Sequence, residues 1–239
     1  MGEEGAKALA SALNRGTFPC LTRIDIHNCG VGREGAKAIA SALEGGALQV
    51  LELINLGCNS IDAEGVKALA NVLERGSFPQ LQIVDFHSNC IGDEGVMALV
   101  AAFKRGAHRH IEFLNLSSNG IGPHGAKSLA SAVEHGAFPQ LKNLHLLNNV
   151  IQTEGVEAFV AALDHATLPL LECVYLDVGH HASEVLRRVH NATSGARTRG
   201  RVFLLLAAEC ARCDAPVKRF LERDGDHAVM FSVWGFMLS

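Results

Sequence analysis

Two pairs of side chains in the first half of the chain could bind a metal ion or transfer a proton. Asp25 lies two residues before His27, and Asp85 lies two residues before His87. On a strand, residues two apart point to the same face. The repeat described below would place the pairs two strands apart, about 9–10 Å at the usual strand spacing. We expect this to be too far for one zinc ion, whose ligands lie at about 2 Å, and we interpret both pairs as solvated polar contacts.

The other candidates for chemistry are weaker. Cys210 and Cys213 form a C-x-x-C pair, and a zinc site would need two further ligands from His227 or the His180-His181 pair. We favour unpaired structural thiols. The chain has no glycine-rich phosphate loop, no G-x-S-x-G elbow and no H-E-x-x-H motif. The sequence therefore predicts a protein that is not an enzyme and that carries no cofactor and no metal.

A regular repeat dominates residues 2–179 and must position these side chains. Its glycine column, in which each member follows the last by 30 positions, is Gly5, Gly35, Gly65, Gly95, Gly125 and Gly155. Apolar columns with the same interval begin with Leu21, Ile24, Ile26 and Val31, and the polar column is Cys29, Asn59, Asn89, Asn119 and Asn149. Their spacing is L-x-x-L-x-L-x-x-N/C-x-L, five times in fixed phase and begun a sixth time.

Each unit of this repeat predicts a short strand followed by a helix. Apolar residues two apart indicate a strand with one buried face, and apolar residues at helical spacing follow, as in Val96, Leu99, Val100 and Phe103. The asparagine column is expected inside the turn, bonded to backbone groups of neighbouring units. Asp62 and Asp93 are expected at helix N-termini. Glycines are expected to end the helices, and in three units a Phe-Pro pair, such as Phe78-Pro79, is expected to follow and stop the helix.

The run from Ile91 to Leu99, IGDEGVMAL, resembles leucine-rich repeats of the ribonuclease-inhibitor type. The resemblance covers residues 2–179. It implies an α/β solenoid with a parallel sheet on the concave face and helices outside. Ribonuclease inhibitor, the Ran GTPase-activating protein and the sensor halves of NOD-like receptors belong to this family. These relatives share binding rather than chemistry, so the resemblance predicts the fold more sharply than the partner.

The concave strand residues are the predicted binding site. Leu53, Ile83 and Phe113 would form an apolar strip beside a ladder of polar side chains, which is how many binding surfaces are composed. The alternative is that these three residues cover the edge of the sheet. The full set of predicted partner-binding residues is Asp25, His27, Leu53, Asn55, Ile83, Asp85, His87, Phe113, Asn115, His145 and Tyr175.

Composition changes near residue 180. Residues 180–239 hold 9 Lys and Arg against 6 Asp and Glu, which leaves 12 against 19 for residues 1–179. We predict a solenoid over residues 1–182 and a helical C-terminal cap or tail over residues 183–239. The tail is predicted to contain helices over Ser183–His190, over Arg201–Ala211, after Pro216 and after Asp226. Such a tail could fold back as a cap, or it could be an amphipathic arm for a partner or a weak dimer.

The whole chain has a net charge of −4 and 7 cysteines. This charge argues against nucleic-acid or anionic membrane partners. An odd number of cysteines without framework spacing, and no signal-like or membrane-spanning segment, favour a reduced protein in the cytoplasm or nucleus. We predict a protein–protein interaction module, a scaffold or recognition subunit. The alternative is a regulator of a GTPase or hydrolase, for which the acidic repeats would suit a basic partner.

Overall fold

Strands and helices alternate along the part of the chain that the computed structural model describes, residues 1–16, 18–44, 48–75, 78–105, 109–165, 170–171, 173–177 and 203–206. The helices are α1 (Gly2–Asn14), α2 (Gly32–Leu43), α3 (Ala63–Glu74), α4 (Gly92–Arg105), α5 (Pro123–Glu134) and α6 (Gln152–His165). The strands are β1 (Arg23–Asp25), β2 (Leu53–Asn55), β3 (Ile83–Asp85), β4 (Phe113–Asn115), β5 (Asn143–His145), β6 (Cys173–Leu176) and β7 (Phe203–Leu206).

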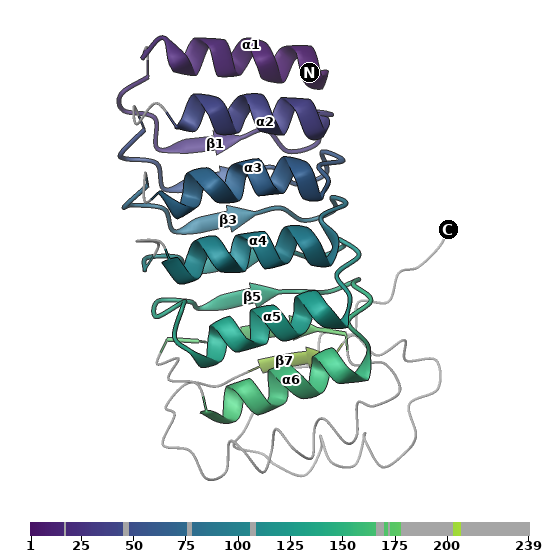
Figure 1. Ribbon diagram of the computed structural model, residues 1–239. Coiled ribbons are helices and arrows are strands. Elements are labelled where there is room, and N and C mark those ends of the chain that lie inside the picture. The colour runs from purple at the N-terminus through teal and green to yellow at the C-terminus, as the bar shows by residue number, and fades with distance from the viewer. Residues whose placement is uncertain are drawn as a thin grey trace, which may run out of the picture.

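The strands form one parallel sheet in the order of the sequence, β1 to β7. The helices stack in a second layer on one side of that sheet, each next to its neighbour in sequence (Figure 1). Each strand residue pairs with the residue 30 positions later, as in Arg23 with Leu53 and Leu53 with Ile83. The columns of the sequence are thus rows across the sheet, and the predicted solenoid of β–α units is confirmed.

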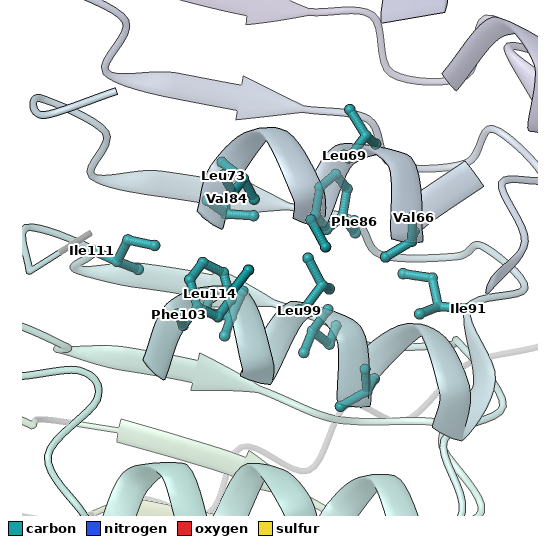
Figure 2. Close-up of a cluster of buried hydrophobic side chains, with 14 of the residues drawn as sticks. Val66, Leu69, Leu73, Val84, Phe86, Ile91, Leu99, Phe103, Ile111 and Leu114 are labelled. Atoms are coloured by element: carbon teal, nitrogen blue, oxygen red, sulfur yellow. The ribbon is translucent and has the colours of Figure 1, made fainter. Parts of the chain in front are cut away.

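The core fills the space between the strand layer and the helix layer. The middle residue of every strand from β1 to β5 is buried, as is Val174 of β6, and so are the apolar stripes of the helices. Figure 2 shows one such cluster, in which Leu69 and Leu73 of α3 lie near Val84 of β3 and Phe86. Burying large side chains of this kind stabilises a fold by about 1.5–3 kcal/mol each.

Glycines let neighbouring helices approach closely. A Cβ on Gly35 would lie 2.8 Å from the Cβ of Ala6, and one on Gly155 would lie 2.8 Å from the Cβ of Ala126. Asp62 is an N-cap, as predicted, and accepts a hydrogen bond from the backbone of Gly65 at 3.0 Å. Asp93 lies in the first turn of α4 and accepts from the backbone N–H of Gly122 at 2.6 Å, so it joins two units.

The asparagine column forms a buried ladder between units. Asn89 Oδ1 accepts from the backbone N–H groups of Asn59 (3.1 Å) and Ile61 (2.9 Å). Its Nδ2 donates to the carbonyl oxygens of Leu56 (3.0 Å) and Phe86 (2.9 Å). The side chains of Asn59 and Asn149 bond in the same way. The predicted role of this column, satisfying backbone groups of neighbouring units, is confirmed.

The helix predicted over Arg201–Ala211 is wrong at residues 203–206, which form β7 and pair in parallel with β6. Cys173 pairs with Phe203, so the interval of the repeat continues for one more strand. A run of four apolar residues is ambiguous between helix and strand, and the open edge of β6 favours pairing. The predicted helices over Ser183–His190, after Pro216 and after Asp226 lie outside the described residues, as do Cys210, Cys213 and the histidines 180, 181 and 227. The boundary at residue 182 stays a prediction.

Candidate functional site

The side of the sheet away from the helices carries the polar and half-exposed side chains of the strands. We call it the open sheet face. The middle residue of each strand points into the core, and the first and third residues point outward. The open sheet face comprises Arg23, Asp25, His27, Leu53, Asn55, Gly57, Ile83, Asp85, His87, Phe113, Asn115, Asn143, His145 and Tyr175.

The third residue of a strand also closes the turn that follows it. Asn55 Oδ1 accepts from the backbone N–H of Gly57 at 3.0 Å, and Asn115 Oδ1 accepts from that of Ser117 at 3.1 Å. Asp85 Oδ1 accepts from the backbone N–H of His87 at 3.0 Å. These side chains therefore hold the strand ends in shape, a role that the sequence analysis did not assign to them.

The imidazole rings of His27 and His87 stack on each other, with centroids 5.1 Å apart. The two strands that carry them are separated by β2, as predicted, but the strand spacing does not describe the distance between the side chains. Gly57 lies between them and has no side chain. A Cβ there would lie 2.3 Å from Cε1 of His87, so the ring of His87 leans over Gly57. The prediction that these histidines lie too far apart to share a ligand is wrong.

Cys58 joins the two histidines. Its Sγ lies 3.5 Å from Nε2 of His87. One ligand atom each from His27, Cys58 and His87 can be chosen so that all three lie within 4.8 Å of one another. The backbone of Cys58 has a φ of 55°, in the left-handed region. Sequence reasoning missed Cys58, although the single glycine between two histidines of one column was a usable signal.

Asp85 holds the ring of His87 from the other side. Its Oδ1 lies 2.7 Å from Nδ1 of His87, and its Oδ2 accepts from Nδ2 of Asn115 at 3.3 Å. Both side chains are largely covered, with 26% of His87 and 16% of Asp85 exposed. Asp85 and Asn115, two of the polar residues predicted to line this face, are therefore hydrogen-bonded to each other.

Aromatic rings form a second cluster at the other end of the open sheet face. The ring of His145 lies 4.8 Å from that of Phe113 and 4.2 Å from that of Tyr175, between centroids. Burial lowers the pKa of His145 below its ordinary value of 6.5, and the more distant Asp85 carboxylate opposes this shift. This shift favours the uncharged imidazole, so the cluster presents mainly aromatic rings.

The apolar strip predicted from the sequence runs across β2, β3 and β4 and ends at Phe113 of the aromatic cluster. Leu53 pairs with Ile83, and Ile83 pairs with Phe113, so the three side chains are neighbours on consecutive strands. Each is half-buried. Glu112, which precedes β4, forms an ion pair with Lys142 at 2.6 Å. The strip is thus bordered by charged and polar groups.

The structure places all eleven predicted partner-binding residues on the open sheet face, and it gathers most of them into two clusters. His27, Asp85, His87 and Asn115 lie in the first, and Phe113, His145 and Tyr175 lie in the second. Leu53 and Ile83 form the apolar strip with Phe113, and Asp25 and Asn55 pair across β1 and β2. Whether these residues bind a partner stays a prediction.

The repeats match a known protein-family model. A family model described as leucine-rich repeat matches residues 19–40, 47–70, 79–100 and 107–130. These four segments are leucine-rich repeats. The predicted leucine-rich-repeat solenoid is confirmed, since each matched segment contains one strand and the start of the helix that follows it. A comparison with curated proteins gives no significant match.

Two solved structures are similar to this leucine-rich-repeat chain. One is Leiomodin-1 Actin-Binding Site 2, with a TM-score of 0.47, 14% identity, and coverage of 77% of this chain and 85% of that chain. The other is the C-terminal domain of tropomodulin from Caenorhabditis elegans, with a TM-score of 0.47, 14% identity, and coverage of 79% and 91%. This likeness assigns no partner. Within the described segments, no helix has both the length and the apolar character needed to cross a membrane.

Proposed function

We propose that the chain is a protein–protein interaction module that binds its partner on the open sheet face. The observation that carries this proposal is the half-exposed strip of Leu53, Ile83 and Phe113, which lies in register across three strands. In protein interfaces, apolar anchors near the centre of a polar surface supply most of the binding energy.

The structure around the strip supports this proposal in two ways. Parallel strands about 4.8 Å apart hold the three side chains at a fixed spacing, so little ordering is needed on binding. The rings of Phe113, His145 and Tyr175 continue the strip toward β6. Aromatic side chains are enriched in interfaces because they bury a large area at a small cost in side-chain entropy.

Charge suggests the kind of partner. Residues 1–179 contain 12 Lys and Arg against 19 Asp and Glu, and Lys142, which precedes β5, is already paired with Glu112. A protein segment that presents an apolar side chain beside basic groups would be complementary to this surface. Electrostatic complementarity of this kind raises association rates and selects among partners.

We also propose that the repeats are of the ribonuclease-inhibitor subtype. Its support is the long repeat unit, in which a full α-helix follows each strand from β1 to β5. In this subtype the face of the sheet opposite the helices is the expected binding surface. The helical side is less suited to binding, because ion pairs such as Lys67 with Glu94 already occupy it.

Affinity capture from a cell extract with three purified variants tests the proposal. Ile83→Glu with Phe113→Glu places two carboxylates on adjacent strands, about 5 Å apart, and a partner would have to desolvate both. The matched control, Asn71→Glu with Met97→Glu, adds the same charge at exposed positions of α3 and α4. The third variant lacks residues 195–239. Circular dichroism and thermal melting verify that each variant is folded.

The expected result is a set of proteins that the wild-type chain and the α3/α4 control retain, and that the Ile83/Phe113 variant loses. Loss of about 2 kcal/mol or more in binding is typical for a central anchor, and this weakens capture at least about 30-fold. Retention of the same set by the Ile83/Phe113 variant, with its loss on deletion of residues 195–239, would place binding in the tail and overturn the proposal.

A further inference from the structure

We propose that His27, Cys58 and His87 bind one zinc ion on the open sheet face. Imidazole nitrogen and thiolate sulfur are the ligands that zinc prefers in proteins. The three residues come from three consecutive units of the solenoid, and one donor atom from each lies within 4.8 Å of the others. This site is separate from the apolar strip and would operate whether or not the strip binds a partner.

The distances fit a tetrahedral ion. With a Zn–S bond of about 2.3 Å and Zn–N bonds of about 2.0–2.1 Å, the donor atoms around a tetrahedral zinc lie roughly 3.3–3.6 Å apart. The Sγ of Cys58 lies 3.5 Å from Nε2 of His87, within this range. His27 is exposed and stacked on His87. Zinc binding would move its side chain out of this stack, so that its donor atom comes closer than the 4.8 Å within which the three donors now lie.

Asp85 prepares His87 for this role. With Nδ1 protonated, the imidazole donates to Oδ1 of Asp85 at 2.7 Å, which leaves the lone pair of Nε2 directed toward Cys58. A carboxylate that holds the second nitrogen of a histidine ligand is a regular feature of zinc sites, because it fixes the tautomer and raises the basicity of the ring. Asp85 is itself held by Asn115 at 3.3 Å.

The sequence of the second unit departs from its neighbours at the two positions that this site needs. Gly57 is the one glycine in a column that otherwise holds His27, His87, Ser117, Leu147 and Asp177. Without it the two imidazoles could not meet, because a Cβ would lie 2.3 Å from the ring of His87.

Cys58 is the second departure. It lies at a position with positive φ whose equivalents are Asn28, Ser88, Ser118 and Asn148. Asparagine and other small polar residues are the usual occupants of left-handed backbone, and cysteine is not. The thiol at this position lies 3.5 Å from a histidine nitrogen, where it can act as a metal ligand. On binding, Cys58 loses its proton to solvent, and a water molecule completes the coordination, since His27 leaves one side of the site exposed.

A titration of the reduced, full-length protein with Co²⁺ tests the proposal. Tetrahedral Co²⁺ bound to a thiolate gives a charge-transfer band and intense visible absorption, and Zn²⁺ should abolish both by displacement. We expect one equivalent of Co²⁺ to bind to the wild-type chain. Cys58→Ser should remove the charge-transfer band, and His27→Asn or His87→Asn should weaken binding at least about 100-fold. Asp85→Asn, which leaves all three ligands present, should weaken binding about 10–100-fold.

Gly57→Leu is a test that keeps every ligand. Leu147 holds the same position in another unit, so the fold accepts leucine there, but the side chain would separate the two histidines. We expect an unchanged circular dichroism spectrum and the loss of Co²⁺ binding. Cys90→Ser, an exposed cysteine, is the matched control and should bind like the wild-type chain.

Two results would overturn the proposal. One is the absence of stoichiometric Co²⁺ or Zn²⁺ binding by the folded wild-type protein. The other is a charge-transfer band that persists in Cys58→Ser and disappears in the Cys210→Ser, Cys213→Ser double variant, which would move the metal to the C-x-x-C pair. Neither result bears on the proposed function, because the capture experiment uses variants outside this cluster.

Discussion

At the scale of single residues, the ladder asparagines connect each unit to the backbone of the unit before it. Each side chain reaches backbone groups of its own unit and of the preceding one, as Asn89 does with Phe86 and Leu56. Buried amides that satisfy several backbone groups at once make the turn rigid, because each lost partner would leave a polar group without water. The turn geometry that places His87 therefore depends on Asn89.

Replacing Asn89 with alanine should lower the free energy of unfolding by roughly 1–3 kcal/mol, because it leaves buried N–H and C=O groups without partners. Urea denaturation followed by circular dichroism measures this change. Asn71→Ala, at an exposed position of α3, is the control and should change stability by less than about 0.5 kcal/mol. Equal stability of the two variants would contradict the structural role of the ladder.

Much of the candidate site was predictable from the sequence at this scale. Alternation of apolar and polar residues correctly assigned Asp25 and Ile83 to the solvent-facing side of the sheet. The contact of His27 with His87 was not predictable from strand spacing, since that argument measures backbone separation. The ring of His87 leans over Gly57 and reaches His27 across the intervening strand. The 30-residue interval of the repeat gives no information about such a side-chain contact.

At the scale of elements, a buried phenylalanine holds the loops that return from α3 and α5 to the next strand. Phe78 and Phe138 are each only 1% exposed, and the ring of Phe138 contacts that of Phe103 with centroids 5.2 Å apart. Phe18 holds the equivalent position in the first unit but is 41% exposed. The phenylalanine of the Phe-Pro motif is therefore part of the core at positions 78 and 138, but it is much more exposed at position 18, near the N-terminal end of the array.

Phe78→Ala should destabilise the protein by about 3–5 kcal/mol, since it empties a fully buried site. Phe18→Ala, which changes the same motif at the N-terminal end, should cost less than about 1 kcal/mol, because much of that ring is already in water. Chemical denaturation of the two variants in parallel gives both values. Equal losses would show that burial of this phenylalanine does not control how firmly the loop packs.

The strands and helices of the array were largely predictable, because each column recurs at a constant interval and each has a single structural role in the unit. The seventh strand was not predicted. Its neighbouring sequence lacks the asparagine turn, and the run Phe203–Leu206 has no alternation that separates a strand from a helix. The available signal was that Phe203 follows Cys173 at the same interval that separates the earlier strands.

At the scale of the whole molecule, the strands form one continuous parallel sheet and the helices cover one side of it (Figure 1). In such an array each unit contacts mainly its neighbours, so the open sheet face is assembled from residues far apart in sequence. Regulation of a GTPase or hydrolase, the alternative from the sequence, stays a prediction. A change in GTP hydrolysis by small GTPases when the protein is added would favour it over a simple scaffold.

Site-specific photo-crosslinking can show whether this molecule binds partners through the open sheet face. A photoreactive amino acid replaces Phe113 on the strand side in one variant, and Met97, 49% exposed on α4, in the other. Both are irradiated in the same cell extract, and the adducts are compared by mass. We expect a discrete protein adduct from position 113 that excess unlabelled wild-type chain suppresses, and no such adduct from position 97. Competed adducts from position 97 alone would contradict this expectation.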